Sequence, residues 1–288
     1  MLVINAEADC QVSLDKAIRL ARQDDFELVL LSCDHSQYLV EGYYFDDQEL
    51  TLLRAEYLAE RKARLEEIAD PLRANGLAVT TISEWSHPNY EAIIKQAKLL
   101  DVDLILHHVV RHGALSRMML SHDDWQLIRL SPVPLLIVKD KAWRDNLAIV
   151  AAVDPLHARH KPSGLDHKIL CVSQHLAELL DGNVLAVHTY NPVIFSGQYP
   201  VEAKAQHKKV FTDLMDEVGL PKEQQMLLEA APVFGLQKAE DSVDANIVVM
   251  GAVSRSMIAD WIIGNTTEQV VDYLKSDVLV LKPDKIES

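Results

Sequence analysis

The sequence lacks the features that suit a protein to nucleic acid, to a membrane or to an oxidising compartment. Its 28 lysines and arginines face 43 aspartates and glutamates, a formal net charge of −15, whereas nucleic acid and anionic membranes bind basic surfaces. No apolar run approaches the roughly 20 residues that span a bilayer. Its three cysteines, Cys10, Cys33 and Cys171, show no CxxC or metal-ligand spacing, which is typical of a reducing compartment. No nucleic-acid or membrane partner is expected, and the predicted location is the cytoplasm.

Recognised catalytic motifs are absent as well. There is no Gly-x-Ser-x-Gly elbow, no Gly-Lys-[Ser/Thr] phosphate loop and no HExxH helix. Four histidines (His107, His108, His112 and His122) fall in one region, but no cysteine or carboxylate completes a metal-ligand spacing there. Adjacent residues of a strand also point to opposite faces. We therefore predict no catalytic residue and no metal ligand, and a dedicated enzyme is not expected.

The chain does contain an internal repeat, which is the strongest signal in the sequence. Residues 101–139 align with residues 244–282 without a gap, at a constant offset of 143. Both copies consist of an apolar strand, a polar loop, an amphipathic helix, a second apolar strand and then a lysine. The preceding parts of the two halves match in order, although not in length.

Short apolar strands alternate with helices in each half, which indicates a parallel sheet covered on both faces. We predict an α/β fold with two tandem doubly wound five-stranded sheets, one in residues 1–140 and the other in residues 147–284. The last strand of each half is wholly apolar, at 135–138 and 277–281, and an uncovered apolar edge is an aggregation hazard. Pairing of these two edges would make the chain an intramolecular pseudo-dimer; further homodimerisation is left open.

Ligands of doubly wound sheets bind beyond the carboxyl ends of the strands, where the strand order reverses. In the second half Asp154 follows the first strand, His188 lies at the end of the second, and Met250 and Gly251 end the fourth. A carboxylate at position 154 would accept hydrogen bonds from a base or a ribose. These four residues are the predicted binding residues on that side of the site.

A phosphate-facing side is predicted from the segment after Gly251. The turn Gly264-Asn265-Thr266 precedes a helix, and Thr266-Thr-Glu-Gln269 fits a capping box. Backbone N–H groups at the start of a helix attract phosphate, and Ser254 and Arg255 would add side-chain donors. The predicted site thus also includes Ser254, Arg255, Gly264, Asn265 and Thr266.

These residues resemble the universal stress protein family, whose nucleotide-binding members carry Gly-x2-Gly-x9-Gly-[Ser/Thr] between the fourth strand and the last helix. Gly251 and Gly264 match, whereas Ser254 replaces the second glycine and Asn265 replaces the Ser/Thr. The resemblance implies that Asp154 takes the adenine side, the Met250-Gly251 edge faces the adenosine, and the Gly264 turn faces the phosphates. The Lys139-Asp140-x-x-Trp143 linker and the Gly264-Asn265-Thr266-x-Glu268-Gln269 turn resemble the tandem E-type members.

The first half has lost this pattern. His108, Arg111 and Ser121 stand where the family has its three glycines, and Asn5 stands where Asp154 stands in the second half. Large side chains would crowd a phosphate loop. The first half is therefore predicted to be structural, or to take some other ligand.

The resemblance implies a cytoplasmic stress-response protein that binds a ligand in its C-terminal half, ATP with Mg²⁺ or a related nucleotide. In the absence of a catalytic base it would act non-catalytically, as a switch or scaffold toward protein partners that the sequence does not identify. Two alternatives stay open. One is a protein–protein interaction module without nucleotide, in which the loop serves helix capping and packing. The other is a slow ATP hydrolase.

Overall fold

The structure is a computed structural model that describes residues 1–4, 10–23, 26–36, 39, 46–109, 120–156, 164–190, 200–252 and 270–283. The chain divides into two compact units. The first unit consists of residues 1–109 and 120–140, and the second begins at Lys141.

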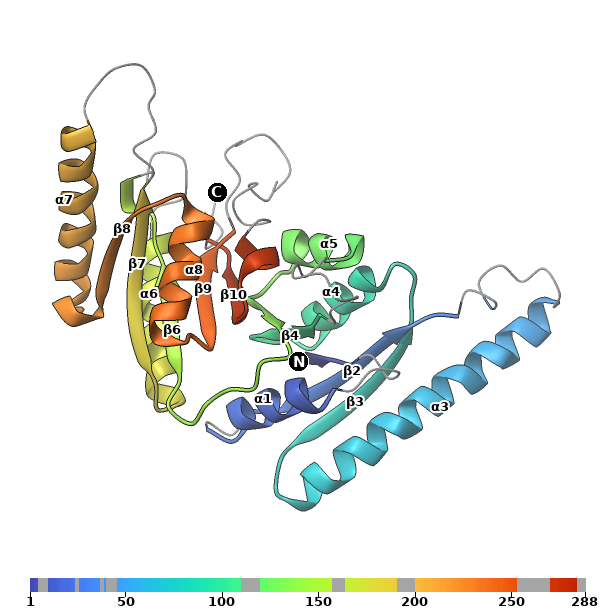
Figure 1. Cartoon of the computed structure of the whole chain (residues 1–288). Coiled ribbons are helices and arrows are strands. Elements are labelled where there is room, and N and C mark those ends of the chain that lie inside the picture. The colour runs from blue at the N-terminus through green and yellow to red at the C-terminus, as the bar shows by residue number, and fades with distance from the viewer. Residues whose placement is uncertain are drawn as a thin grey trace. The chain divides into compact units, whose positions relative to one another are not determined.

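The first unit alternates strands with helices. Its elements are β1 (Leu2–Val3), α1 (Gln11–Ala21), β2 (Leu28–Asp34), α3 (Asp47–Ala74), β3 (Val79–Trp85), α4 (Asn89–Leu99), β4 (Ile105–His108), α5 (His122–Leu130) and β5 (Leu135–Val138). The strands lie in the order β3-β2-β1-β4-β5, and each neighbouring pair runs parallel (Figure 1). The order reverses between β1 and β4.

The second unit repeats this plan. Its elements are β6 (Ala148–Ala152), α6 (Leu165–Leu179), β7 (Asn183–Tyr190), α7 (Pro200–Val218), the 3-10 turn η2 (Lys222–Gln224), β8 (Gln225–Glu229), α8 (Pro232–Val243), β9 (Ile247–Gly251) and β10 (Asp277–Leu281). The parallel order is β10-β9-β6-β7-β8. Residues 270–273 are helical and precede β10.

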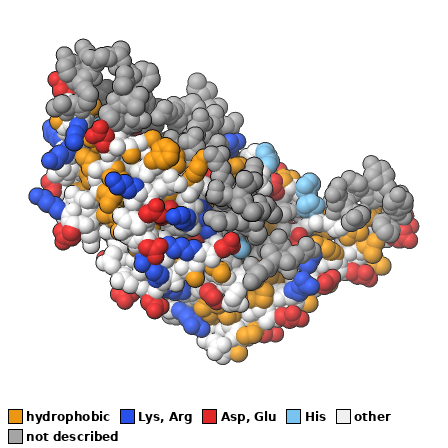
Figure 2. All heavy atoms as spheres, viewed as in Figure 1, with side chains coloured by type: hydrophobic (Ala, Val, Ile, Leu, Met, Phe, Trp, Pro, Cys, Tyr) orange, Lys and Arg blue, Asp and Glu red, His pale blue; other side chains and the backbone are white. Residues whose placement is uncertain are grey.

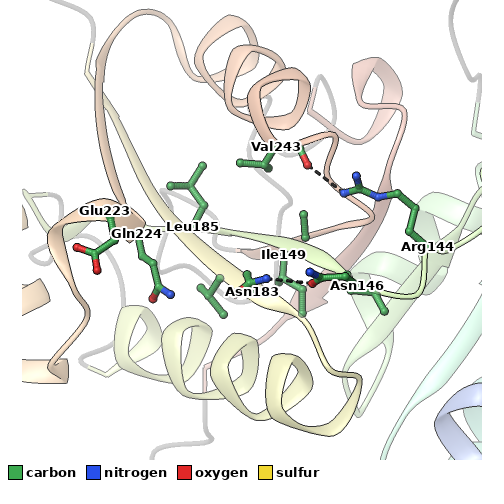
Figure 3. Close-up of a pocket in the computed structure, with 11 residues that line it drawn as sticks. Arg144, Asn146, Ile149, Asn183, Leu185, Glu223, Gln224 and Val243 are labelled. Carbon is green, nitrogen blue, oxygen red and sulfur yellow. Dashed lines mark hydrogen bonds between the residues drawn. The ribbon is translucent and has the colours of Figure 1, made fainter.

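Helices cover both faces of the second sheet. His188 and Thr189 are neighbours on β7 and point to opposite faces: His188 contacts Phe211 of α7, and Thr189 lies against Gly235 of α8. Figure 3 shows α6 and α8 on opposite sides of the strands. The strands between these layers are buried, and all five residues of β10 are at most 3% exposed. A strand covered on both faces has no polar side to show, which explains the apolar runs.

The predicted fold class is confirmed, because each unit is a doubly wound parallel sheet of five strands. Pairing of the two units through their last strands stays a prediction. Within the described residues no helix combines the length and the apolar composition needed to cross a bilayer.

Most of the charged side chains of the long helix α3 lie on faces that are not buried in the core. Asp46 caps it by accepting the N–H groups of Gln48 and Glu49 at 2.9 and 2.8 Å. Of its 28 residues, three in the second half of the helix are buried: Arg61, Leu65 and Ala69. The remaining charges lie outside the core, and Figure 2 shows acidic and basic side chains interspersed over the visible face.

Candidate functional site

The second unit brings part of the predicted site to one edge of its sheet. β6 lies between β7 and β9, so the strand order reverses at β6 and β9, which is where doubly wound sheets bind ligands. Asp154 follows β6, and Met250 and Gly251 end β9. The phosphate-facing residues of the prediction lie outside the described residues: Ser254, Arg255, Gly264, Asn265 and Thr266.

Asp154 is held by its backbone and presents its side chain. Its N–H donates to Oδ1 of Asp166 at 3.0 Å, and Asp166 is buried in the first turn of α6. The Asp154 side chain is 50% exposed. The buried Asp166 thus fixes the main chain at position 154. The Asp154 carboxylate stays at the edge, where it can accept hydrogen bonds from a ligand.

His188 differs from Asp154 because it is fully buried. Its Nδ1 lies 3.0 Å from the carbonyl oxygen of Val153, and its Nε2 lies 2.8 Å from Nδ1 of His207 on α7. His188 therefore contacts the edge through the carbonyl group of Val153, the residue before Asp154. Its buried ring does not face a ligand at the surface of the edge.

His207 and Tyr190 are components of this edge that sequence reasoning missed. The Tyr190 ring stacks on His207 with a centroid distance of 4.8 Å and an interplanar angle of 20°, and its hydroxyl lies 3.1 Å from Oε2 of Glu229. A signal for His207 existed in the helical spacing, because it precedes the buried Phe211 by one turn.

Gly251 has a packing reason of its own to be glycine. A Cβ at this position would lie 2.6 Å from Cδ2 and 3.2 Å from Cγ of Leu165, at the start of α6. Met250 beside it is 6% exposed. The family glycine at 251 therefore lets α6 approach β9, whether or not a ligand binds there.

In the first unit, carboxylates occupy the start of α5, which corresponds to the phosphate-facing turn of the second unit. At the offset of 143, Ser121 corresponds to Gly264 and Asp123 to Thr266. Ser121 N–H donates to Oδ2 of Asp124 at 2.7 Å, and Asp124 Oδ1 lies 2.6 Å from Nε2 of His107. Asp123 Oδ2 accepts the N–H of Asn89, which starts α4, at 2.8 Å. Two carboxylates at this helix start would repel a phosphate. That the first half is structural, or takes some other ligand, stays a prediction.

A model of the universal stress protein family matches residues 1–139 and 149–282 of the chain. The chain belongs to the universal stress protein family. It is 25% identical to universal stress protein E of Escherichia coli K12 over 301 residues, and 24% identical to universal stress protein E of Photorhabdus laumondii over 303 residues; both alignments cover 100% of this chain and 95% of the relative.

A solved structure of a functionally unknown protein from Pseudomonas aeruginosa PAO1 is 26% identical and superposes with a TM-score of 0.78. The superposition covers 98% of this chain and 92% of the other. Both the family and the resemblance to its tandem E-type members are thereby confirmed, with one family domain in each half.

Within this member of the universal stress protein family, Asp124 gives the first unit a testable dependence on pH. Burial raises the pKa of its carboxyl, but hydrogen bonding and charge from His107, with the bonds from Ser121, lower it by more, so the pKa lies below its ordinary value. The ionised Asp124 therefore stabilises the fold at every pH above about 3.9, the pKa of an aspartate in the unfolded chain. This stabilisation is lost as the pH falls through the lower pKa that Asp124 has in the folded protein.

We expect Asp124→Asn to lower the free energy of unfolding by about 1–3 kcal/mol near neutral pH, because the variant loses the charge-assisted bonds. The difference from wild type should shrink below about pH 4. Urea unfolding at about pH 7, 5 and 3.5 measures it. Glu67→Gln, an exposed change on α3, should leave stability unchanged. A deficit in Asp124→Asn that stays constant down to the lowest pH would contradict the assignment.

The described histidines of the cluster that the sequence singled out each contact a different partner. His107 contacts Asp124, His108 Nε2 lies 3.0 Å from Oδ1 of Asp140, and His122 contacts Gln126. His112 lies outside the described residues. Among the residues that the structure does describe, no group of three or more histidines, cysteines and carboxylates is placed to hold a metal ion.

A hollow of about 460 Å³ lies at the opposite edge of the second unit's sheet, at the amino ends of its strands. Buried aliphatic residues such as Leu185 and Ile149 line it, and Arg144, Asn146 and Asn183 stand at its rim (Figure 3). The guanidinium of Arg144 donates to carbonyl oxygens of Val243 and Asp244 at 3.0 and 2.8 Å. The hollow is thus separate from the family's ligand edge. The one cation named at its rim, Arg144, already donates its hydrogen bonds to the end of α8.

Proposed function

We propose that this stress-response protein acts in the cytoplasm by binding ATP with Mg²⁺, or a related nucleotide, in its second unit and presenting the bound state to protein partners. The observation that carries the proposal is the contrast between the two ligand edges. The second unit presents a half-exposed Asp154 after β6, at the sheet edge where Gly251 ends β9. In the first unit the start of α5, which corresponds to the phosphate-facing turn, carries Asp123 and Asp124 instead.

The roles of the residues follow from their chemistry. Asp154 would accept hydrogen bonds from the adenosine side, next to the edge formed by Met250 and Gly251. The phosphates would be held by N–H and side-chain donors of the loop: Ser254, Arg255, Gly264, Asn265 and Thr266. Bound Mg²⁺ would neutralise phosphate charge, which a chain of net charge −15 otherwise repels.

The proposed role is non-catalytic. No side chain of the described edge combines exposure with the position of a general base for water: His188 is fully buried, and Asp154 is assigned to the adenosine side. The nucleotide would therefore stay intact as a switch or a scaffold component.

Calorimetric titration of the nucleotide-stripped protein with Mg-ATP tests the proposal. We expect one site per chain with micromolar affinity in the wild type and no binding in Gly264→Arg, because an arginine fills the phosphate turn. His122→Arg adds the same charge at the exposed start of α5 in the first unit, and should bind ATP like the wild type.

Each alternative has its own signature in the same samples. Absence of heat and of thermal stabilisation at millimolar ATP would overturn nucleotide binding and leave a protein–protein interaction module. Phosphate release that follows the protein through purification and disappears in Gly264→Arg would overturn the non-catalytic role and identify a slow ATP hydrolase.

A further inference from the structure

A pair of hydrogen-bonded histidines lies beneath the ligand edge of the second unit. The rings of His188 and His207 are 5.0 Å apart at an angle of 34°, and His188 Nε2 lies 2.8 Å from His207 Nδ1. His188 is fully buried on β7, whereas His207 is half-buried on α7. A buried polar pair of this kind is stable only when its hydrogen bonds are satisfied.

The partners determine where the protons lie. A carbonyl oxygen only accepts, so the Nδ1 of His188, 3.0 Å from the oxygen of Val153, carries a proton. In a neutral His188 the Nε2 then accepts, and Nδ1 of His207 donates to it. One added proton on either ring keeps an N–H···N bond between the two rings. Two added protons would set N–H against N–H and place two positive charges side by side, which like-charge repulsion opposes.

His207 is also an anchor for the first half of α7, which lies alongside β7 and β8 (Figure 1). From Glu202 to Lys209 the side chains are exposed, except those of Ala203 and His207. The buried residues of α7 begin at Phe211. The histidine pair is therefore a principal link from this part of α7 to the end of β6.

We propose that His188 is a positioning residue for the ligand edge, and that the His188–His207 pair holds at most one added proton, so that acidification releases the edge. The positioning part rests on the proposed function. His188 holds the carbonyl of Val153, the residue before Asp154, and His207 fixes the His188 ring in the orientation that does so. Ligand affinity then depends on the protonation of a pair that does not touch the ligand.

The acidic groups around the pair favour uptake of the first proton. They do not relieve the N–H against N–H contact that a second proton would create between the two rings. Asp154 Oδ1 lies 4.0 Å from His188 Nδ1 at the end of β6, and Asp166 of α6 binds the Asp154 backbone. On β7 and β8, Tyr190 stacks on His207 and its hydroxyl bonds to Glu229. Lys204 of α7 lies 3.9 Å from that same Glu229.

The sign of the effect follows from proton counting. Below the ordinary histidine pKa of about 6.5, an unfolded chain binds two protons at these positions and the folded pair binds one. Acid therefore opposes the paired state, and the population of the paired edge decreases with falling pH below about 6.5. Above that pH the pair is fully formed.

Ring NMR of the wild-type protein, with assignments from His188→Gln and His207→Gln, tests the one-proton property without any ligand. We expect the pair to take up its two protons in separate steps, the second only at clearly lower pH than the first, whereas His207→Gln leaves a single step from His188. Two independent titrations near the ordinary pKa in the wild type would overturn the one-proton pair.

Titration with Mg-ATP between about pH 7.5 and 5.5 tests positioning. His207→Gln keeps a side chain that donates or accepts, so we expect affinity within about twofold of the wild type at pH 7.5 and little loss at pH 5.5. His207→Phe keeps a ring beside Tyr190 but cannot donate, so affinity should fall by about tenfold at pH 7.5. The affinity of the wild type should fall by about tenfold on acidification, because a difference of one bound proton changes an equilibrium constant tenfold for each pH unit below about 6.5.

His167→Gln is the matched control, because His167 is an exposed histidine of α6 that pairs with Glu217. It should behave like the wild type at each pH. Wild-type affinity in His207→Phe would overturn positioning while leaving the proposed function intact. Absence of wild-type binding at pH 7.5 would overturn the proposed function, and the NMR titration would then decide on the proton pair by itself.

Discussion

Replacing Glu240 with alanine should lower the free energy of unfolding by about 3–5 kcal/mol. Glu240 is 3% exposed on α8, and its Oε1 accepts the N–H groups of Lys275 and Ser276 at 2.7 and 2.5 Å, as well as the Ser276 hydroxyl. Alanine would leave three donors without their acceptor where water has little access. An unsatisfied buried donor costs about 1–3 kcal/mol.

Chemical unfolding in urea, followed by circular dichroism, measures this change. Glu240→Gln keeps an acceptor oxygen and should lose clearly less. Asp241→Ala removes the next carboxylate along the chain, an exposed one that lies 3.0 Å from Nζ of Lys275, and should cost less than about 1 kcal/mol because surface ion pairs contribute little. Equal losses in Glu240→Ala and Asp241→Ala would show that the turn before β10 does not depend on the buried carboxylate.

Trp143→Ala should cost about 3 kcal/mol, because it removes an aromatic side chain and the donor to a buried carboxylate. Trp143 Nε1 donates to Oδ2 of Asp277 at 2.7 Å, and Asp277 is 1% exposed at the start of β10. The neighbouring Lys141 reaches Oδ1 of Asp244 at 2.6 Å, and Arg144 reaches Oδ2 of Asp244 at 3.3 Å. These contacts hold the linker on the amino edge of the second unit.

Differential scanning calorimetry would show this loss as a lower unfolding temperature. Trp143→Phe keeps a ring but not the N–H, so about 1–2 kcal/mol should be lost. Lys141→Ala breaks a partly exposed ion pair and should have a small effect. Wild-type stability in Trp143→Ala would mean that the linker does not contribute to the folding of the second unit.

The fold was largely predictable because the repeat is visible in local sequence. α4 and α8 begin at Asn89 and Pro232, again 143 residues apart. They are followed by Asp101 and Asp244, which both adopt left-handed backbone with φ of 49° and 48°, a conformation that aspartate tolerates better than most residues. Apolar strands and helical spacing are short-range signals, so each half could be interpreted without the other.

The candidate site was predictable only where it depends on the ends of strands. The position of Asp154 follows from the strand before it. The contact between His188 of β7 and His207 of α7 joins residues that are 19 positions apart in the chain. No local sequence pattern predicts that these faces of the strand and the helix meet. Likewise Gly251 matched a ligand motif, while its closeness to Leu165 of α6 is a matter of tertiary packing. The closure of the first edge by Asp123 and Asp124 depends on side-chain directions that spacing does not specify.

The two carboxylates in the first turn of α5, Asp123 and Asp124, have a consequence for cooperativity. Tandem copies of a binding fold would ordinarily offer two equivalent sites whose occupancies can influence each other. Here the start of α5 carries Asp123 and Asp124, which accept the N–H groups of Asn89 and Ser121. If the nucleotide binds in the second unit alone, as we propose, one chain offers one site. Binding to the isolated chain should then follow a simple hyperbola, and any sigmoidal response would have to come from association between chains.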